Sequence, residues 1–214
     1  MRSAVWNVRG VGSTCKKRMV KTLLKEESIK IIGLIETKHS NISAKDMEQY
    51  WGNQDCEWLH IPAEEGGSGG IILTWIKESF SLIKHIVRQR WIAVKGILQQ
   101  EWFPCTICVV YAPNDQHERL DVWNQLRAIK KNLAVPLLLM GDFNEVLSPE
   151  ERRGASDITS GMRDLRQCVQ DLQLIDLAIN LKYALVRRKA VSRIDRVLVE
   201  AQFLESFPML STYL

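Results

Sequence analysis

Nine short apolar runs, rich in β-branched and aromatic residues, recur along the 214-residue chain and constrain its fold more than any other feature. Runs of this length and composition are typical of β-strands in a packed sheet. The predicted strands are Ala4–Val8, Lys30–Ile35, Glu57–Ile61, Gly70–Ile76, Phe80–Val87, Trp91–Leu98, Thr106–Tyr111, Pro136–Met140 and Arg193–Val199. A chain with this many strands needs more than one sheet layer to bury them.

Three segments between the predicted strands repeat apolar residues at helical spacing: Lys16–Glu27, Gln116–Asn132 and Gly161–Leu172. The Gly-rich stretch 66–70 precedes a strand rather than a helix, so we interpret it as a turn and not as a phosphate-binding loop. Several strands follow one another through short turns, which indicates antiparallel pairing. The pattern predicts a single α/β (α+β) domain over residues 1–214, with two sheets packed face to face and helices outside.

The charge and cysteine content indicate the kind of partner and the cellular compartment of the protein. Lys and Arg number 29 against 25 Asp and Glu, and the net charge of +4 favours an anionic partner. No apolar run approaches the ~20 residues of a membrane-spanning helix, and no signal peptide opens the chain, so we expect no membrane partner. Five scattered cysteines predict reduced thiols in an intracellular protein. Cys105 and Cys108 lie three apart on a predicted strand and are interpreted as buried structural thiols on opposite faces.

Polar residues stand at the ends of several predicted strands, where hydrophobic packing alone does not explain them. A single acid at such a place is usually a cap or turn residue, but several together indicate a site at a shared rim. Asp195 is a further polar residue in an apolar segment, although it lies within its predicted strand and not at the end. The residues in question are Asn7, Glu36, Tyr111, Asp142, Asn144 and Asp195.

These residue types suit the hydrolysis of a phosphodiester. The Glu36 carboxylate is the kind of hard oxygen ligand that Mg²⁺ prefers. Asp142 could deprotonate a water for in-line attack, while the Asn144 amide and the Tyr111 hydroxyl could donate to the phosphate oxygens. The alternative, an inert sandwich with polar turns, leaves the joint placement of these residues unexplained.

Six motifs run in order along most of the chain: Trp6-Asn7-Val8-Arg9-Gly10, Gly33-Leu34-Ile35-Glu36-Thr37-Lys38, Tyr111-Ala112-Pro113-Asn114, Gly141-Asp142-Phe143-Asn144-Glu145, Glu151-Arg152-Arg153-Gly154 and Ser192-Arg193-Ile194-Asp195-Arg196-Val197-Leu198. In this combination the sequence resembles the endonuclease/exonuclease/phosphatase superfamily, and most closely the apurinic-type endonuclease domain of plant non-LTR (LINE-type) retrotransposons. The resemblance implies a four-layered α/β/β/α sandwich of the DNase I-like type. It also implies a monomeric, Mg²⁺-dependent DNA endonuclease, with Mn²⁺ as an alternative ion, no small-molecule cofactor and a nuclear place of work.

The resemblance assigns roles to individual residues. Glu36 matches the metal-ligand glutamate, and Asn7 matches the asparagine that supports the metal and nucleophile. Asp142 matches the water-activating aspartate, and Asn144 matches its phosphate-binding partner. Asp195 matches the aspartate that orients the catalytic histidine.

Three further positions are expected to contact substrate. Tyr111 matches the phosphate-contacting tyrosine and Asn114 a substrate-contacting asparagine. Arg9 stands where DNA-repair relatives carry a second acid, and an arginine there is typical of the plant retroelement branch.

The sequence departs from the family pattern at two places. The family closes with Ser-Asp-His on a final core strand, whereas no such motif follows Ser206, and the four histidines all precede Asp142. Tyr183-Ala184-Leu185 stands where relatives carry an aromatic-Thr-Trp strand. Because loss of one member of a catalytic unit can cost ~10³ to 10⁶ in rate, we predict a C-terminally truncated relic, missing its last core strand, with weak or no nuclease activity.

Three hypotheses stay open: a weakened Mg²⁺-dependent DNA endonuclease, an inactive remnant that still binds nucleic acid, and an enzyme acting on phosphoinositides or another phosphoester. The motifs at 151–154 and 192–196 argue against the third. Basic clusters at 16–18, 152–153 and 187–189, with Arg193 and Arg196, are interpreted as solvated faces or as phosphate contacts. Trp51, Trp58, Trp75, Trp91, Trp102 and Trp123 are interpreted mainly as core residues.

Overall fold

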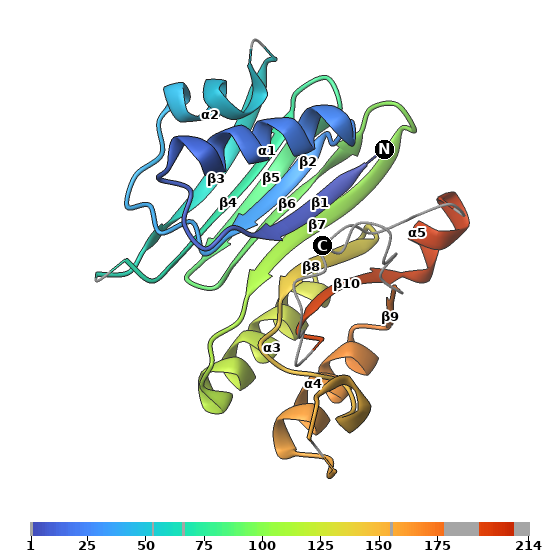
Figure 1. Cartoon of the computed structure of the whole chain (residues 1–214). Coiled ribbons are helices and arrows are strands. Elements are labelled where there is room, and N and C mark those ends of the chain that lie inside the picture. The colour runs from blue at the N-terminus through green and yellow to red at the C-terminus, as the bar shows by residue number, and fades with distance from the viewer. Residues whose placement is uncertain (1, 53, 66, 155, 178–192, 208–214) are drawn as a thin grey trace.

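Two β-sheets form the centre of the computed structural model, which describes residues 2–207 except 53, 66, 155 and 178–192 (Figure 1). The first sheet has the strand order β1-β2-β4-β3 and the second β5-β6-β7-β8-β10-β9. The first consists of β1 (Ser3–Asn7), β2 (Ile31–Ile35), β3 (Cys56–Ala63) and β4 (Gly69–Ile76). The second consists of β5 (Phe80–Arg88), β6 (Trp91–Leu98), β7 (Phe103–Tyr111), β8 (Leu137–Asp142), β9 (Leu174–Asp176) and β10 (Asp195–Glu200).

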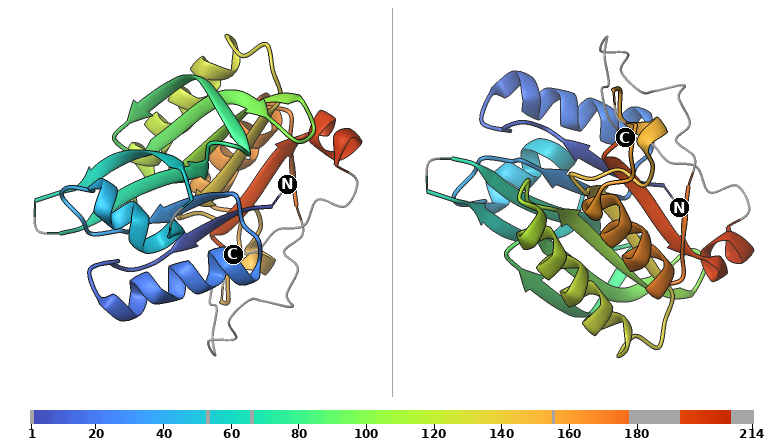
Figure 2. Two further views of the ribbon diagram at one scale, coloured as in Figure 1. Left: turned by 90° about the horizontal axis from the view of Figure 1, so that it is seen from above. Right: turned by 90° about the horizontal axis from the view of Figure 1, so that it is seen from below.

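Helices cover the outer face of each sheet (Figure 2). They are α1 (Thr14–Glu26), α2 (Ala44–Trp51), α3 (Gln116–Lys130) and α4 (Ser160–Asp171). The short α5 (Ala201–Ser206) packs instead on the core between the sheets through Phe203, and a 3₁₀ turn lies at Pro149–Glu151. Three apolar clusters separate the layers. One lies between the sheets around Ile35, Leu73 and Val109, one lies under α1 and α2, and one lies under α3 and α4. Three clusters between four layers confirm the predicted α/β/β/α sandwich.

The two sheets approach each other closely at Gly33 of β2. A Cβ atom at this position would lie 2.6 Å from a methyl carbon of Val109 on β7, a separation that packed side chains do not reach. Glycine therefore allows the middle of β2 to pack directly on the second sheet. This contact fixes the separation of the layers a few residues from the strand ends that carry Glu36 and Tyr111.

All nine predicted strands are present, with shifts of one to three residues at most ends. The three predicted helices correspond to α1, α3 and α4. Helix α2, α5 and the three-residue β9 were not predicted. Helix α2 has only eight residues and is stabilised at its start by a capping box, in which Ser43 and Asp46 each accept from the other's backbone N–H.

The side chains of the central strands follow the predicted faces. Cys105 packs between the sheets and Cys108 under α3, so the two thiols do lie on opposite faces of β7. Burial raises the pKa of Cys105 to about 12 and that of Cys108 still further, which confirms that both are structural. Trp102 is the exception among the tryptophans expected in the core, since it is 75% exposed in the turn before β7.

No helix in the described part of the chain has the length and apolar character needed to cross a membrane.

Candidate active site

Strand register brings the predicted polar residues to one rim of the sandwich. Strands β1 and β2 run parallel with Asn7 opposite Ile35, so that Glu36 follows directly. In the second sheet, Tyr111 at the end of β7 lies opposite Asp142 at the end of β8. Asp142 in turn lies opposite Asp195 at the start of the antiparallel β10. The rim therefore collects residues that are up to 188 positions apart in the sequence.

Asn7 connects the two sheets at this rim. Its Nδ2 atom donates to Oε1 of Glu36 at 2.9 Å and lies 3.4 Å from Oδ2 of Asp142. The hydroxyl of Tyr111 also donates to Oε1 of Glu36, at 3.2 Å. Glu36 is thus held by one group from each sheet, and among the described residues no hydrogen bond engages its second carboxylate oxygen.

The backbone around the rim adopts unusual conformations. Arg9, Glu36, Lys38 and Asn144 all have φ between 47° and 57°, a region that residues other than glycine rarely occupy. Such strain costs of order 1–3 kcal/mol per residue and tends to cluster at functional sites. Four of the seven such residues in the described chain therefore lie in the turns after β1, β2 and β8.

Gly141 shapes the end of β8. It has φ of 150°, and a Cβ atom there would overlap the carbonyl oxygen of Val110. Only glycine lets β8 approach β7 at this point and turn Asp142 toward the rim. Asp142 is then fixed from the other side, because the backbone N–H of Asn144 donates to its Oδ1 at 2.9 Å.

Asn144 and Asn114 occupy neighbouring loops. The Nδ2 atom of Asn144 donates to the carbonyl of Ala112 at 2.6 Å, which ties the loop after β8 to the loop after β7. Asn114 lies in the latter loop, and its carbonyl accepts from Nη1 of Arg119 at 2.5 Å. The structure thus places both asparagines beside the Tyr111 side of the rim.

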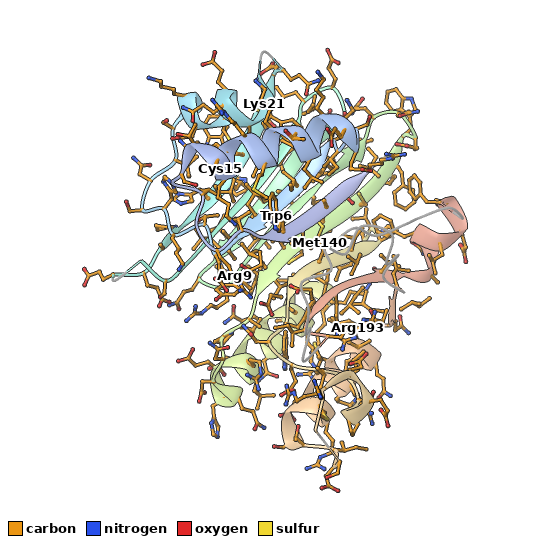
Figure 3. The ribbon with its side chains drawn as sticks, viewed as in Figure 1. Trp6, Arg9, Cys15, Lys21, Met140 and Arg193 are labelled. Carbon is orange, nitrogen blue, oxygen red and sulfur yellow. The ribbon has the colours of Figure 1, made fainter. Side chains whose placement is uncertain are left out.

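The electrostatics of the rim are dominated by clustered carboxylates. Burial raises the pKa of Asp195 to about 7, and the negative charges of Asp142 and Glu36 add to the rise. The pKa of Asp142 is raised as well, mainly by burial and in part by Glu36. Arg9 lies close enough for its positive charge to oppose both shifts. Figure 3 shows Arg9 just beyond the end of the strand that carries Trp6.

Tyr111 is a proton donor at neutral pH. Burial, followed by the charge of Glu36, raises the pKa of its phenol to about 12. The neutral hydroxyl can donate to an anionic oxygen, but it cannot act as a base near pH 7.

The donor set suits a hard divalent cation in part. Within residues 2–207 outside the gaps, no group of three or more His, Cys, Asp or Glu side chains meets the geometry of a protein-only metal site. Mg²⁺, however, often takes one or two carboxylates and completes its shell with water and substrate oxygens. Glu36 at the junction of two sheets, with Asp142 and Asp195 nearby, fits an ion held in that way.

The four histidines lie away from these acids. The contacts of His39, His60, His85 and His117 within the described residues include none with Glu36, Asp142 or Asp195. His60 interacts instead with the carbonyl of His39, and burial lowers its pKa. The motifs Tyr183-Ala184-Leu185 and Arg187-Arg188-Lys189 lie outside the described residues.

Two buried ion-pair networks behind the rim were not predicted. Arg119 donates to Glu145 at 2.9 Å, and Glu145 also accepts from Arg152 at 2.9 Å. Arg119, in the first turns of α3, also donates to the carbonyls of Pro113 and Asn114. Glu145 follows Asn144 in the loop after β8, so the pair joins these two loops. The two ion pairs of Glu145 join residues 26 and 7 positions apart, and the run of charges in the sequence does not reveal such pairing.

The second network fixes the start of β10. Arg196 is fully buried and pairs with Glu151 and Asp176, and Arg193 pairs with the same two acids. The interpretation of Arg196 as a solvated or phosphate-contacting residue was therefore wrong, because its guanidinium group is buried against acids of the protein. Arg152 and Arg193 are 33% and 30% exposed and also pair with acids. Asp195 lies next to this rigid cluster.

The part of the sequence that carries this rim matches a known protein family. The sequence pattern of the Endonuclease/Exonuclease/phosphatase family matches residues 4–207. The chain belongs to this family. The match covers every residue of the rim described above.

Solved structures of other proteins with this fold superpose on nearly the whole chain. The catalytic domain of APE2 from Xenopus laevis is 18% identical with a TM-score of 0.69, covering 96% of this chain and 84% of that one. The endonuclease domain of TRAS1, a telomere-specific non-LTR retrotransposon, is 12% identical with a TM-score of 0.69, covering 94% and 85%. A mannosyl-6-phosphatase of Bacteroides thetaiotaomicron is 14% identical with a TM-score of 0.64, covering 93% and 85%. Since one fold hosts nucleases and a sugar phosphatase, the substrate must be argued from the site.

Proposed function

We propose that this family member is a divalent-metal-dependent phosphodiesterase of the endonuclease type that acts on DNA. The observation that carries the proposal is the convergence of Asn7 and Glu36 from one sheet with Asp142 from the other, joined through the Asn7 amide. Hydrolysis of a phosphodiester needs a positioned water, a base and neutral or cationic donors for the phosphate oxygens. At the rim, Asp142 could act as the base, and the hydroxyl of Tyr111 and the amide of Asn7 are donors linked to the same acids.

Each side chain has a proposed task. Glu36 would hold Mg²⁺, or Mn²⁺ in its place, with Asn7 keeping the carboxylate oriented. The ion, when bound, supplies Lewis-acid polarisation of the phosphate. Asp142 would hold and deprotonate the attacking water, because its carboxylate is fixed by the N–H of Asn144.

The remaining residues would hold the phosphate. The neutral hydroxyl of Tyr111, which donates to Glu36 in this structure, would turn to a non-bridging oxygen of a bound phosphate, and Asn144 and Asn114 lie in the adjoining loops. Arg9 brings a positive charge to the opposite side of the acids. Asp195, with a raised pKa, would serve as an acid beside Asp142 rather than as the partner of a histidine.

The DNA substrate and the retroelement relationship rest on the motifs at 151–154 and 192–196 and on the likeness to retrotransposon and AP endonuclease folds. A nuclear location and a monomeric state would suit an enzyme that cleaves DNA. Turnover should be weak, since no histidine of the described residues contacts the acids. For the same reason an inactive remnant that still binds nucleic acid is the second candidate.

Nicking of supercoiled plasmid tests the proposal. Purified protein is incubated with Mg²⁺ or with EDTA, beside Glu36→Ala and the matched control Glu78→Ala, which alters an exposed glutamate in the turn between β4 and β5. We expect Mg²⁺-dependent nicking that Glu36→Ala abolishes and Glu78→Ala leaves unchanged. A folded protein, by circular dichroism, that leaves the plasmid intact but retards it on a gel would favour the binding remnant.

A further inference from the structure

Two adjoining hollows extend away from the rim on the Tyr111 side. The inner pocket, of about 260 Å³, is lined by Tyr111, Asn114, Ser68 and Gly69 among others. The outer pocket, of about 290 Å³, is lined by Gln89, Asp121, Val122 and Gln125. Arg90, Pro113 and Glu118 border both, so the two hollows lie side by side. Neither pocket takes part in the chemistry proposed for Glu36 and Asp142.

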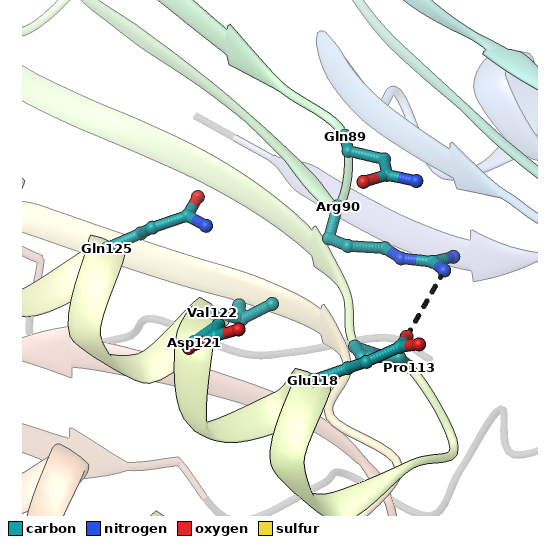
Figure 4. Close-up of a pocket in the computed structure, with 7 residues that line it drawn as sticks. All are labelled: Gln89, Arg90, Pro113, Glu118, Asp121, Val122 and Gln125. Carbon is teal, nitrogen blue, oxygen red and sulfur yellow. Dashed lines mark ion pairs between the residues drawn. The ribbon is translucent and has the colours of Figure 1, made fainter.

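Arg90 forms the partition between the pockets. Its Nη2 atom lies 3.0 Å from Glu64, in the loop between β3 and β4, and 3.6 Å from Glu118 at the start of α3 (Figure 4). Both ion pairs use the same nitrogen. Nε and Nη1 are therefore available as donors, as far as the described residues go. The carbonyl of Arg90 accepts from the N–H of Tyr111 at 2.9 Å, which ties the partition to the strand that carries the rim.

Gln125 presents a defined group to the outer pocket. Its Oε1 atom accepts from the indole nitrogen of Trp91 at 3.0 Å, and Trp91 is buried. An indole N–H can only donate, so the oxygen of the amide must face Trp91 and the NH₂ group is the end left to face a ligand. Figure 4 shows Gln125 on α3 and Gln89 and Arg90 on the turn between β5 and β6, lining the hollow from two sides.

The charge of these walls selects the kind of ligand. Arg90 is the cation, whereas Glu64, Asp115, Glu118 and Asp121 are all acidic. In the outer pocket the two carboxylates of Glu118 and Asp121 face the single guanidinium of Arg90, which disfavours a phosphate group there. A neutral planar group fits better, because its N–H groups could donate to the carboxylates while its ring nitrogen and carbonyl accept from Arg90 and Gln125. Pro113 and Val122 add apolar surface for its faces.

We propose that the outer pocket binds one unpaired nucleobase of the substrate strand, with guanine preferred, and that Arg90 and Gln125 read it. Guanine carries two acceptors on one edge, the pattern that arginine recognises, and N–H donors on the next edge. A base paired within a duplex cannot enter a pocket of this size, so the strand must be single or locally open beside the cleavage point. The inference rests on the proposed function and defines the substrate of the same site.

Binding of short oligonucleotides tests the inference without requiring turnover. The probes are fluorescein-labelled eight-residue DNAs, either all thymine or thymine with one central guanine, measured by anisotropy in EDTA. We expect the guanine probe to bind on the order of tenfold more tightly, since one good base contact discriminates by about 1–3 kcal/mol. Pairing the same guanine in a duplex should remove its advantage.

Two variants test whether Gln125 and Arg90 cause the preference for the guanine probe. Gln125→Glu keeps the oxygen that accepts from Trp91 but replaces the NH₂ donor, and Arg90→Met removes the guanidinium donors. Both should bind the two probes equally, while Gln49→Glu, the same change at an exposed position of α2, should keep the preference. Thermal unfolding of each variant checks folding.

The outcomes separate the two proposals. Equal binding of both probes by the unaltered protein would overturn the base pocket, and plasmid nicking in the same preparation would show that the proposed function survives. A guanine preference that persists in Gln125→Glu and Arg90→Met would also overturn it. Absence of both nicking and DNA binding would remove the proposed function and the pocket with it.

Discussion

Replacing Glu145 by glutamine should strongly destabilise the protein. Glu145 is buried and holds two guanidinium groups, those of Arg119 and Arg152, at 2.9 Å each. The substitution keeps the shape of the side chain and removes its charge. A change of shape is excluded as the cause of any effect, which matters because Gly161 packs directly on this carboxylate.

The expected loss of stability depends on which of the two arginines paired with Glu145 can be solvated. The side chain of Arg152 is 33% exposed and can be solvated, whereas that of Arg119 is only 9% exposed and must remain buried. Removing one partner of a buried pair costs about 3–5 kcal/mol. Arg119 keeps its hydrogen bonds to the carbonyls of Pro113 and Asn114, so we expect a loss near the lower end, about 3 kcal/mol.

Urea unfolding followed by circular dichroism measures this loss. The control is Glu26→Gln, which makes the same change at an exposed position of α1 and should cost less than about 0.5 kcal/mol. Adding Arg119→Met to Glu145→Gln should recover part of the stability, because the unpaired buried charge is gone. If Glu145→Gln costs no more than its control, the pair does not clamp the two loops and the reasoning is refuted.

Three further perturbations test other parts of the molecule. Burial and the nearby acids raise the pKa of Asp195 to about 7, so the folded state keeps a proton that the unfolded state loses near pH 4. In EDTA, the free energy of unfolding measured with urea should therefore fall as the pH rises from about 4 to 7 and level off above. Asp195→Asn should flatten this fall. An equally steep profile in the variant would contradict the assignment. Gly141→Ala should lower the thermal midpoint sharply, since its Cβ would overlap the Val110 carbonyl, and an unchanged midpoint would show that β8 can shift. Ellman's reagent should label Cys15 rapidly and Cys108 only on unfolding, and rapid labelling of both would contradict the burial of β7.

The sequence predicts the sheets well because each central strand is a continuous apolar run. β2 and β8 are buried at every position, so their residues carry an unambiguous signal. The elements that were not predicted are short, and β9 has only three residues. Its place in the sheet is set by pairing with β10, which no local pattern encodes.

The candidate site was predictable to the extent that its residues interrupt apolar runs. Asn7 and Asp142 end β1 and β8, Glu36 directly follows β2, and register then brings them to one rim. Charged residues were harder to place, because a guanidinium group in the sequence does not reveal its partner. Arg196 follows Asp195 directly, yet it turns into the interior to meet Glu151 and Asp176.

The geometry of the rim depends on how the two sheets pack. Asn7 and Glu36 belong to the first sheet, and Tyr111 and Asp142 to the second, so the bonds from Asn7 to Asp142 and from Tyr111 to Glu36 span the interface between the layers. The separation of the layers is in turn set by core contacts such as the one between Gly33 and Val109. A cavity or an added methyl group there would move the carboxylates relative to one another without touching them. Because a misplacement of about 1 Å can cost 10²-fold in rate, the packing of the core acts directly on the chemistry of the site.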